Sequence, residues 1–266
     1  MELEHKTRII QKQALEIADK NKRLEVKNRA LQELNEEKNN VIGVVSHDLR
    51  APLNRIFALS NLMYLSSDNL NEEQQDYLEK MNKVVRDGLD LIRNFLDIRA
   101  IEYKGLQMNF EEIEIINLLD QMVKSYQTAI EQKKQYISFV NESGENELML
   151  ESDKQYLNRI FDNLISNAIK FTPVGKEIKV VLKKESESIM IRIEDRGPGI
   201  SQEDQRNLFK KFQVLSARPT AGESSTGLGL SITKSLVDIL EGSIRYEGNP
   251  EGGAIFIVEL PVLTHA

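Results

Sequence analysis

The sequence contains no cysteine, which excludes disulfide bonds, thiolate catalysis and cysteine-ligated zinc sites. No apolar run approaches the roughly 20 residues that a transmembrane helix requires, and residues 1–6 contain no apolar signal core. Acidic residues outnumber basic ones by 42 to 35, and no basic stripe with interleaved aromatic residues supports nucleic-acid binding. These absences predict a cytoplasmic segment without membrane contact, from either a soluble protein or a membrane-bound receptor.

Glycine and proline are scarce in the first hundred residues, which therefore favour helix. Apolar residues recur there every seven positions, at Leu3, Ile10, Ile17, Leu24 and Leu31. Asparagine occupies three of the facing a positions, at Asn21, Asn28 and Asn35. Apolar d positions with asparagine at a predict a parallel two-stranded coiled coil over residues 1–39. The alternative is a single solvated, charged helix.

Two stronger apolar stripes follow, at the three- and four-residue spacing of buried helix faces. The first comprises Ile42, Val45, Leu49, Pro52, Ile56, Leu59 and Met63, and the second comprises Leu78, Met81, Val85, Leu89, Ile92 and Leu96. Between them, polar residues at 66–71 break the pattern and supply capping side chains. One helical hairpin buries little surface alone, so residues 40–104 predict a homodimer in which two hairpins form a four-helix bundle.

Gly105 marks a change to mixed helices and strands, so residues 105–266 predict an α+β domain with one sheet covered by helices. Helices are expected at 113–131, 153–169 and 231–240, and strands at 136–141, 177–184, 188–195, 243–246 and 254–260. A segment rich in Ser, Thr, Gly and Ala at 213–226 has the length and composition of a mobile lid. A chain of 266 residues suits two modest domains better than one core.

His47 is the histidine with a distinctive setting, S-H-D-L-R-A-P-L, whereas His5 and His265 lie near the termini. The neighbouring stripe positions predict that His47 faces outward from the bundle. An unperturbed imidazole, with a pKa of about 6.5, is largely neutral and nucleophilic at neutral pH. Asp48 is placed to accept the ring proton, and Arg50 shares a helix face with His47 and can hold a phosphate oxygen. Taken alone, a single histidine more often is an ordinary surface residue.

A polar helical segment, N-L-I-S-N-A-I-K-F-T, begins at Asn163. Asn163 and Asn167 are four residues apart, so both amides lie on one helix face. An amide oxygen there can complete the coordination of Mg²⁺, whose other ligands are commonly water and phosphate oxygens. Lys170 can contact phosphate, and Phe171 can stack on a base. Taken alone, this pattern is explained by chance.

Two short glycine-rich segments follow. Asp195–Ile200 comes directly after a strand, where glycines allow the backbone to approach a ligand and the carboxylate can accept from an adenine amino group. Gly227–Leu230 begins a helix, whose free N–H groups and dipole favour phosphate. Phe209 and Phe212 are expected to hold the base of the intervening loop in the core. Each segment alone is weak evidence.

Taken together, five motifs resemble those of the two-component sensor histidine kinases, in the same order and spacing. They are S-H-D-L-R-A-P-L, N-L-I-S-N-A-I-K-F-T, D-R-G-P-G-I, F-K-K-F and T-G-L-G-L-S-I, within residues 40–261. The resemblance implies a dimerising phosphotransfer hairpin followed by an α/β sandwich ATP-binding domain of the histidine-kinase and gyrase type. It implies a protein-histidine kinase that uses ATP and Mg²⁺ to phosphorylate His47. The phosphoryl group then passes to an aspartate of a response regulator, and an upstream sensor domain lies outside this chain.

The resemblance also implies roles for individual residues. Asp48 matches the family's proposed general base, and Asn167 matches its magnesium-binding asparagine. Asp195 matches the carboxylate that recognises the adenine amino group. The other expected nucleotide contacts are Asn163, Lys170, Phe171, Gly197, Gly199, Phe212, Gly227, Leu228 and Gly229.

Two positions depart from the family pattern. Ala51 stands where the family often has Thr or Asn, which support dephosphorylation of the regulator, so weak phosphatase activity is expected. Ala254 stands where the last strand often has Thr near the adenine, so nucleotide affinity is expected to be modest. The alternative functions are a gyrase- or chaperone-type ATPase, a catalytically silent dimeric ATP-binding scaffold, and a net phosphatase. The first leaves the His47 motif unexplained, the intact nucleotide motifs argue against the second, and Ala51 disfavours the third.

Overall fold

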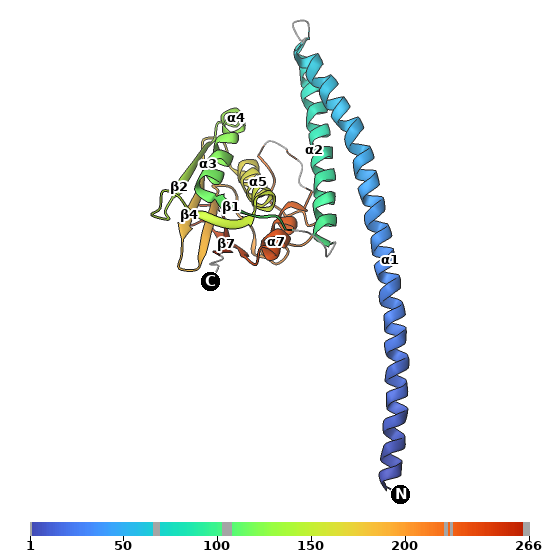
Figure 1. Cartoon of the computed structure of the whole chain (residues 1–266). Helices are drawn as coiled ribbons and strands as arrows, with labels where there is room; N and C mark the ends of the chain where they lie inside the picture. Colours follow the sequence, from blue (N-terminus) through green and yellow to red (C-terminus); the bar gives the residue numbers. More distant parts are fainter. Residues whose placement is uncertain (1, 66–69, 103–107, 221–222, 224–225, 263–266) are drawn as a thin grey trace. The chain divides into compact units, whose positions relative to one another are not determined.

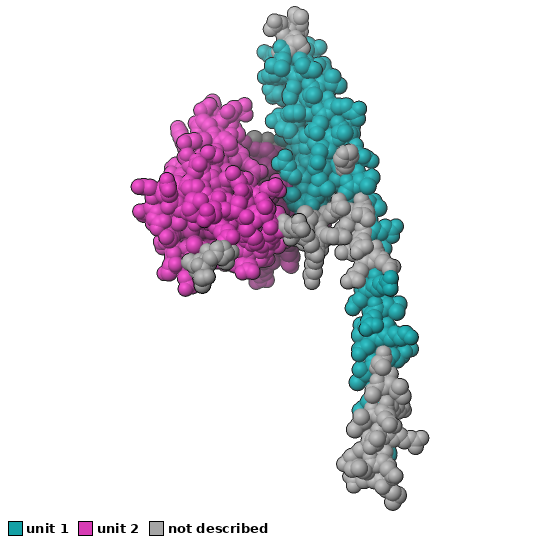
Figure 2. Space-filling view, in the orientation of Figure 1, with its two compact units in different colours: residues 1–99 teal, residues 100–266 magenta. Residues whose placement is uncertain are grey.

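The computed structural model of the 266-residue chain describes residues 2–65, 70–102, 108–220, 223 and 226–262. For parts of the two long helices the description covers the backbone but not every side chain, and the side chain of His47 lies outside it. The chain divides into two compact units, residues 1–99 and 100–266 (Figure 2). Gly105, the predicted point of change, lies outside the described residues. None of the helices described is long and apolar enough to cross a membrane.

The first unit is built from α1 (Glu2–Leu65) and α2 (Glu72–Glu102), as the scarcity of glycine and proline predicts (Figure 1). A reciprocal cap begins α2: Asn71 Oδ1 accepts from the Gln74 amide at 2.9 Å, and Gln74 Oε1 accepts from the Asn71 amide at 3.0 Å. Such a cap satisfies backbone N–H groups that the first helical turn leaves unpaired. The predicted polar break thus acts as a helix start.

The apolar stripe predicted on α1 stays uncovered within the single chain. Leu49, Ile56 and Leu59 are 50%, 41% and 62% exposed. The buried or half-buried side chains of α1 include Ser46, Leu53, Phe57 and Ser60, which follow a different spacing, although Pro52 of the predicted stripe is half-buried too. At 3.6 residues per turn, the two sets lie roughly a quarter of a turn apart around the helix. The helix therefore has one covered face and a second apolar face that no part of the described chain covers.

The second unit contains seven strands and five helices among the described residues. They are β1 (Phe110–Glu114), α3 (Ile115–Ser125), α4 (Gln127–Gln132), β2 (Tyr136–Asn141), β3 (Met149–Asp153), α5 (Lys154–Phe171), β4 (Glu177–Lys184), β5 (Ser188–Glu194), α6 (Gln202–Gln205), α7 (Gly229–Ile239), β6 (Ser243–Gly248) and β7 (Ala254–Pro261). Five strands form one sheet in the order β2-β4-β5-β7-β6, and β1 pairs separately with β3. Within the large sheet, β2 is parallel to β4 and the other neighbours are antiparallel.

Helices α3, α5 and α7 cover one face of this sheet (Figure 1). On β5, alternate residues Ile189, Ile191 and Ile193 are buried, which is the period of a strand with one covered face. On α5, Leu157, Phe161 and Leu164 are fully buried at helical spacing. The predicted α+β sandwich is therefore confirmed, with its core between the sheet and these helices.

The prediction of one helix over residues 113–131 is wrong. Residues up to Glu114 belong to β1, and Tyr126 separates α3 from α4. The physical reason is local, because the Glu114 side chain caps α3 and so ends the strand at that point. Strand β3 and the four-residue helix α6 were also not expected from periodicity, since both are too short for a clear period.

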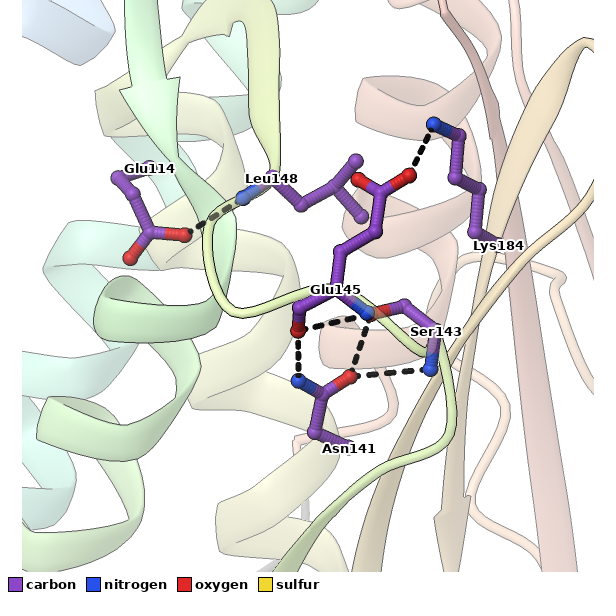
Figure 3. Close-up of polar contacts among 6 residues, drawn as sticks. All are labelled: Glu114, Asn141, Ser143, Glu145, Leu148 and Lys184. Atoms are coloured by element: carbon purple, nitrogen blue, oxygen red, sulfur yellow. Dashed lines mark hydrogen bonds and ion pairs between the residues drawn. The ribbon is translucent and has the colours of Figure 1, made fainter.

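Glu114 joins the start of α3 to the loop that leads into β3. Its Oε1 atom accepts from the amides of Ile116 at 3.2 Å and Leu148 at 3.1 Å. Its Oε2 atom accepts from the amide of Asn117 at 2.6 Å. Figure 3 shows this carboxylate beside the amide of Leu148. One side chain thus satisfies two helix-start N–H groups and one loop N–H group.

The rest of that loop is held by Asn141 and Lys184 (Figure 3). Asn141 Oδ1 accepts from the Ser143 amide at 3.0 Å, and Asn141 Nδ2 donates to the Glu145 carbonyl at 2.8 Å. Lys184, at the end of β4, pairs with the Glu145 carboxylate at 2.6 Å. These contacts order the loop at the end of the sheet opposite to Asp195, since β4 runs antiparallel to β5.

We expect Glu114→Ala to lower the free energy of unfolding of the second unit by about 1 to 3 kcal/mol, because it removes a helix cap and leaves the Leu148 amide without its acceptor. Urea denaturation followed by circular dichroism measures this change. Glu112→Ala is the matched control, because Glu112 is exposed and its side chain has no polar partner in the described part of the chain. Equal destabilisation by the two substitutions would show that Glu114 does not act as a cap.

Candidate functional site

The candidate site is organised along α5. Asp153 caps the start of this helix, because its Oδ1 atom accepts from the amides of Gln155 at 2.9 Å and Tyr156 at 3.1 Å. The side of α5 next to its buried face carries Asn163, Asn167 and Lys170, all half-buried. Their spacing of four and three residues puts them on one helix face, as predicted.

Asn163 lies where α5 meets α7. Its Nδ2 atom donates to Thr233 Oγ1 at 2.7 Å, and Thr233 is buried on α7. Gly229, at the start of α7, is so close that a Cβ atom there would overlap Asn163 Oδ1. Glycine at this position leaves the Asn163 amide in place, whereas a larger residue would force it to shift. The contact brings the Asn163 motif and the Gly227–Leu230 motif together, and Thr233 was not recognised from the sequence.

Asn167 has the properties of a magnesium ligand. Its side chain is half-buried and makes no hydrogen bond with the residues that the structure describes. Its amide oxygen can therefore face a ligand at the site. Those residues include no cluster of three His, Cys, Asp or Glu side chains that would hold a metal ion. One amide oxygen completed by phosphate and water oxygens suits Mg²⁺, which keeps several such ligands.

Asp195 is a buried carboxylate in which one oxygen is hydrogen-bonded and the other is not. It is 5% exposed, and its Oδ1 atom accepts from the amides of Gly197 at 2.8 Å and Ala254 at 3.1 Å. Burial raises the pKa of Asp195 above its ordinary value of 3.8, and the two backbone hydrogen bonds oppose that rise. Oδ2 receives no hydrogen bond from any described residue, so it remains able to accept from a bound molecule.

The turn between β6 and β7 supports Asp195. Asn249 Nδ2 donates to the Asp195 carbonyl at 3.0 Å, and Arg196 donates to Asn249 Oδ1 at 3.1 Å. Gly253 has φ 110°, and a Cβ atom there would overlap the Asp195 carbonyl oxygen. The sequence shows a glycine-rich turn at this place but gives no sign that it contacts the carboxylate segment. Asn249 and Gly253 are thus supporting residues that the sequence did not reveal.

The Asp195–Ile200 segment also contacts the end of α5. A Cβ atom on Gly197 would lie 2.9 Å from the Phe171 carbonyl oxygen, closer than such atoms approach. Gly199 adopts φ 71°, in the left-handed region that glycine adopts without strain. The two predicted glycines therefore serve close packing and a turn, and they bring the Asp195 and Phe171 motifs together.

The lid loop, defined as residues 213–226, is closed at its base by Gly227. A Cβ atom on Gly227 would overlap the backbone of Gln213, so the two ends of the loop lie against each other. Leu228 is buried in the core at the start of α7. Within the loop, Thr220 donates to the Lys170 carbonyl twice, from its amide at 2.9 Å and from its hydroxyl at 3.0 Å. The loop is therefore joined to the last turn of α5.

The expectation that Phe209 and Phe212 both lie in the core is wrong for Phe212. Its side chain is 61% exposed, whereas Phe209 is half-buried. The backbone at Phe212 has φ 62°, a left-handed turn that directs the chain into the lid loop and leaves the ring at the surface. An exposed ring remains available to a ligand, so a nucleotide contact by Phe212 stays a prediction.

His47, Asp48 and Arg50 lie on α1, in the other compact unit from the α5 site. Their backbone is helical, as predicted, and the side chains of Asp48 and Arg50 are exposed. The structure thus brings the predicted nucleotide residues together around α5 and places the predicted phosphorylation residues on a separate unit.

Comparison with known proteins assigns both units. Residues 37–104 match the family model "His Kinase A (phospho-acceptor) domain", and residues 152–264 match "Histidine kinase-, DNA gyrase B-, and HSP90-like ATPase". The chain is 26% identical over 221 residues to the sensor histidine kinase YcbM of Bacillus subtilis, covering 83% of this chain and 70% of YcbM. The chain belongs to the sensor histidine kinases of two-component systems. The expected family and the gyrase-like fold of the second unit are thereby confirmed.

Other relatives of this histidine kinase are longer. It is 30% identical over 253 residues to hybrid signal transduction histidine kinase D of Dictyostelium discoideum, covering 93% of this chain but 16% of that protein. Three further curated relatives are covered over 25% to 31% of their length. Among solved structures, the catalytic domain of histidine kinase ThkA matches with 26% identity and a TM-score of 0.51, over 58% of this chain and 99% of that one. Full-length ShkA shares the fold, with a TM-score of 0.66 and 24% identity over 85% of this chain and 46% of ShkA.

We expect Asp195→Asn to preserve or raise the stability of the second unit, because asparagine Oδ1 can still accept from Gly197 and Ala254 while the buried charge is lost. The pKa of Asp195 is higher in the folded state than in the unfolded state. The contribution of Asp195 to the free energy of unfolding is therefore fully present below the pKa of the unfolded state, and it is lost as the pH rises through the pKa of the folded state. The stability of Asp195→Asn relative to wild type should therefore increase as the pH rises above 3.8.

Thermal melting of wild type and Asp195→Asn across this acidic to neutral range measures the difference. A difference that does not change with pH, or one that increasingly favours wild type as the pH rises, would contradict the buried-charge account.

Proposed function

We propose that this histidine kinase uses Mg-ATP to phosphorylate His47 and then passes the phosphoryl group to an aspartate of a response regulator. The carboxylate of Asp195 is the observation that carries the proposal of nucleotide binding. Its Oδ1 atom accepts from two backbone amides, and its Oδ2 atom is left to accept from the adenine amino group. The phospho-acceptor half is supported by the place of His47 within the matched phospho-acceptor domain. An AMPPNP complex of the structural neighbour ShkA agrees with ATP as the ligand.

The residues around α5 divide the nucleotide between them. Asp195 selects adenine, Phe171 and Phe212 offer aromatic faces to the base, and Gly197 and Gly199 let the backbone approach it. Lys170 and the free N–H groups at the start of α7, at Gly227, Leu228 and Gly229, contact the phosphates. Asn163 and Asn167 line the side of the site between these two groups of contacts.

Asn167 would hold Mg²⁺ through its amide oxygen, and the Asn163–Thr233 hydrogen bond fixes the neighbouring amide. When bound, Mg²⁺ neutralises part of the phosphate charge and orients the terminal phosphate. The protein contributes the orientation of the amide, because α5 is held at its start by Asp153 and along its length by α7. This preorganisation costs nothing at the moment of transfer.

Transfer forms a bond between an imidazole nitrogen of His47 and the γ-phosphorus while the bond from that phosphorus to the bridging oxygen breaks, and ADP leaves. Asp48 accepts the ring proton, and Arg50 stabilises the charge on the transferred group. Such a reaction depends mainly on positioning and charge, since phosphoryl transfer needs little covalent assistance. It requires His47 to meet a nucleotide bound by its own chain or by a partner.

A homodimer accounts for the uncovered apolar face of the first unit. On α1, Leu49, Ile56 and Leu59 are exposed, and on α2, Met81 and Val84 are exposed as well. A second copy would cover these side chains in a four-helix bundle, and the exposed Ile17, Leu24 and Leu31 would extend the contact as a coiled coil. The proposed domains are a coiled coil at 1–39, the hairpin at 40–104 and the ATP-binding domain at 105–266.

The remaining partners follow from the relay. A receiver domain supplies the aspartate, and a sensor outside this chain acts on the coiled coil. Names of relatives such as autoinducer 2 sensor kinase/phosphatase LuxQ of Vibrio harveyi describe signal-linked kinases of this kind. We place this segment in the cytoplasm, where ATP and the receiver are available.

Incubation of the full chain with γ-labelled ATP and Mg²⁺ tests the proposed reaction. We expect protein-bound label that is acid-labile, alkali-stable and absent from His47→Gln, because a phosphoramidate has this chemistry. His5→Gln is the matched control and should retain the label. Label that persists in His47→Gln would identify another acceptor, and absence of label despite ATP binding would favour the silent scaffold.

Ala51 provides a separate test of the direction of the relay. Because alanine cannot hydrogen-bond a water, we expect this kinase to dephosphorylate its regulator slowly, and Ala51→Thr to accelerate that reaction several-fold. The measurement is loss of phosphate from a regulator phosphorylated by this kinase, with autophosphorylation as the control. An unchanged dephosphorylation rate in Ala51→Thr would reject the assigned role of this position.

A further inference from the structure

Lys133, between α4 and β2, contacts both α5 and the lid loop although it belongs to none of the recognised motifs. Its Nζ atom donates to the Ile169 carbonyl at 3.1 Å and to Thr220 Oγ1 at 3.4 Å. It also forms an ion pair with the carboxylate of Glu223. The side chains of Lys133 and Glu223 are 19% and 21% exposed, so this pair is shielded from solvent far more than an ordinary surface pair.

The last turn of α5 receives hydrogen bonds from several other segments. A helix leaves its final carbonyl groups without intrahelical donors, and here other segments supply them. Lys133 and Gln135 both donate to the Ile169 carbonyl, and Gln135 donates further to the Thr172 carbonyl. Thr220 donates to the Lys170 carbonyl. A cation at this end also complements the helix dipole.

The opposite part of the lid loop is held differently. The amide of Ser216 donates to Asp204 Oδ2 at 3.0 Å, and its hydroxyl donates to the same oxygen. These hydrogen bonds lower the pKa of Asp204, which indicates that they favour its charged form. This contact joins the loop to α6. Among the described contacts, the loop is linked to α5 directly by Thr220 and through Lys133, which bonds α5, Thr220 and Glu223.

We infer that Lys133 is a positioning residue for the nucleotide: its ion pair with Glu223 holds the lid loop against the last turn of α5 and thereby fixes Lys170 and Phe171. The inference rests on the proposed function, because it assigns the nucleotide to this helix. Lys133 touches no reacting atom and acts through the loop and the α5 backbone. Lys170 and Phe171 belong to the turn that it caps, so loss of the pair loosens their orientation and the loop together.

A double-mutant cycle on the full chain tests this inference, with Mg-ADP binding measured by isothermal titration calorimetry. We expect Lys133→Met and Glu223→Gln each to raise the Kd for Mg-ADP by about 3- to 10-fold, the range for a shielded, hydrogen-bonded ion pair. The double variant should bind no more weakly than Lys133→Met, since both substitutions remove one interaction.

Lys176→Met is the matched control, because Lys176 is an exposed lysine in the turn after α5 whose side chain has no polar partner in the described part of the chain. Its Kd should equal that of wild type. In autophosphorylation assays the KM for ATP of Lys133→Met should rise by the same factor as the Kd, while the rate at saturating ATP falls less. A general loss of folded protein would instead lower that rate without changing the KM.

Equal or tighter Mg-ADP binding by Lys133→Met would overturn the inference and leave the proposed function intact. Fully additive effects of the two substitutions would overturn the ion pair as the cause. Absence of Mg-ADP binding by wild type would overturn the proposed nucleotide site and this inference with it. Because ADP binding requires no transfer, these outcomes stay separate from the fate of His47.

Discussion

Two backbone amides, from Gly197 and Ala254, hold Oδ1 of Asp195 in a buried position. A buried carboxylate loses much of its hydration, so it persists only where donors replace the lost water. Those donors can reach it only if the turn after β5 and the start of β7 approach closely, which in turn requires glycine at Gly253. The electrostatic demand of one side chain therefore constrains the backbone of three segments, and it leaves Oδ2 without a hydrogen bond from any described residue.

The same principle of close approach operates between α5 and α7. Gly229 permits contact with Asn163, and the amide of Asn163 is then oriented by the Thr233 hydroxyl. In both places a glycine removes a Cβ atom so that a polar side chain of another segment can be placed. The glycines of this kinase thus position Asn163 and Asp195 indirectly, through packing.

Much of this arrangement was predictable, because its signals are local in sequence. The alternation of Ile189, Ile191 and Ile193 and the spacing of Asn163 and Asn167 each specify a face within one element. The supporting contacts are different: Asn163 meets Thr233 70 positions away, and Lys133 meets Thr220 87 positions away. Such pairs depend on how the helices, strands and loops pack together, and the periodicity of residues within one element does not predict that packing. On α1, likewise, the stripe showed an apolar face without showing which partner covers it.

Helix α5 connects contacts that the sequence keeps far apart. At its start, Asp153 Oδ1 caps the helix while Oδ2 accepts from the amide of Asn109, directly before β1. At its end, the Lys170 carbonyl accepts from Thr220 of the lid loop. Internal hydrogen bonds make a helix of 18 residues move as a unit. Asn163 and Asn167 lie between these two anchored ends, so the helix that carries them is tied both to the segment before β1 and to the lid loop.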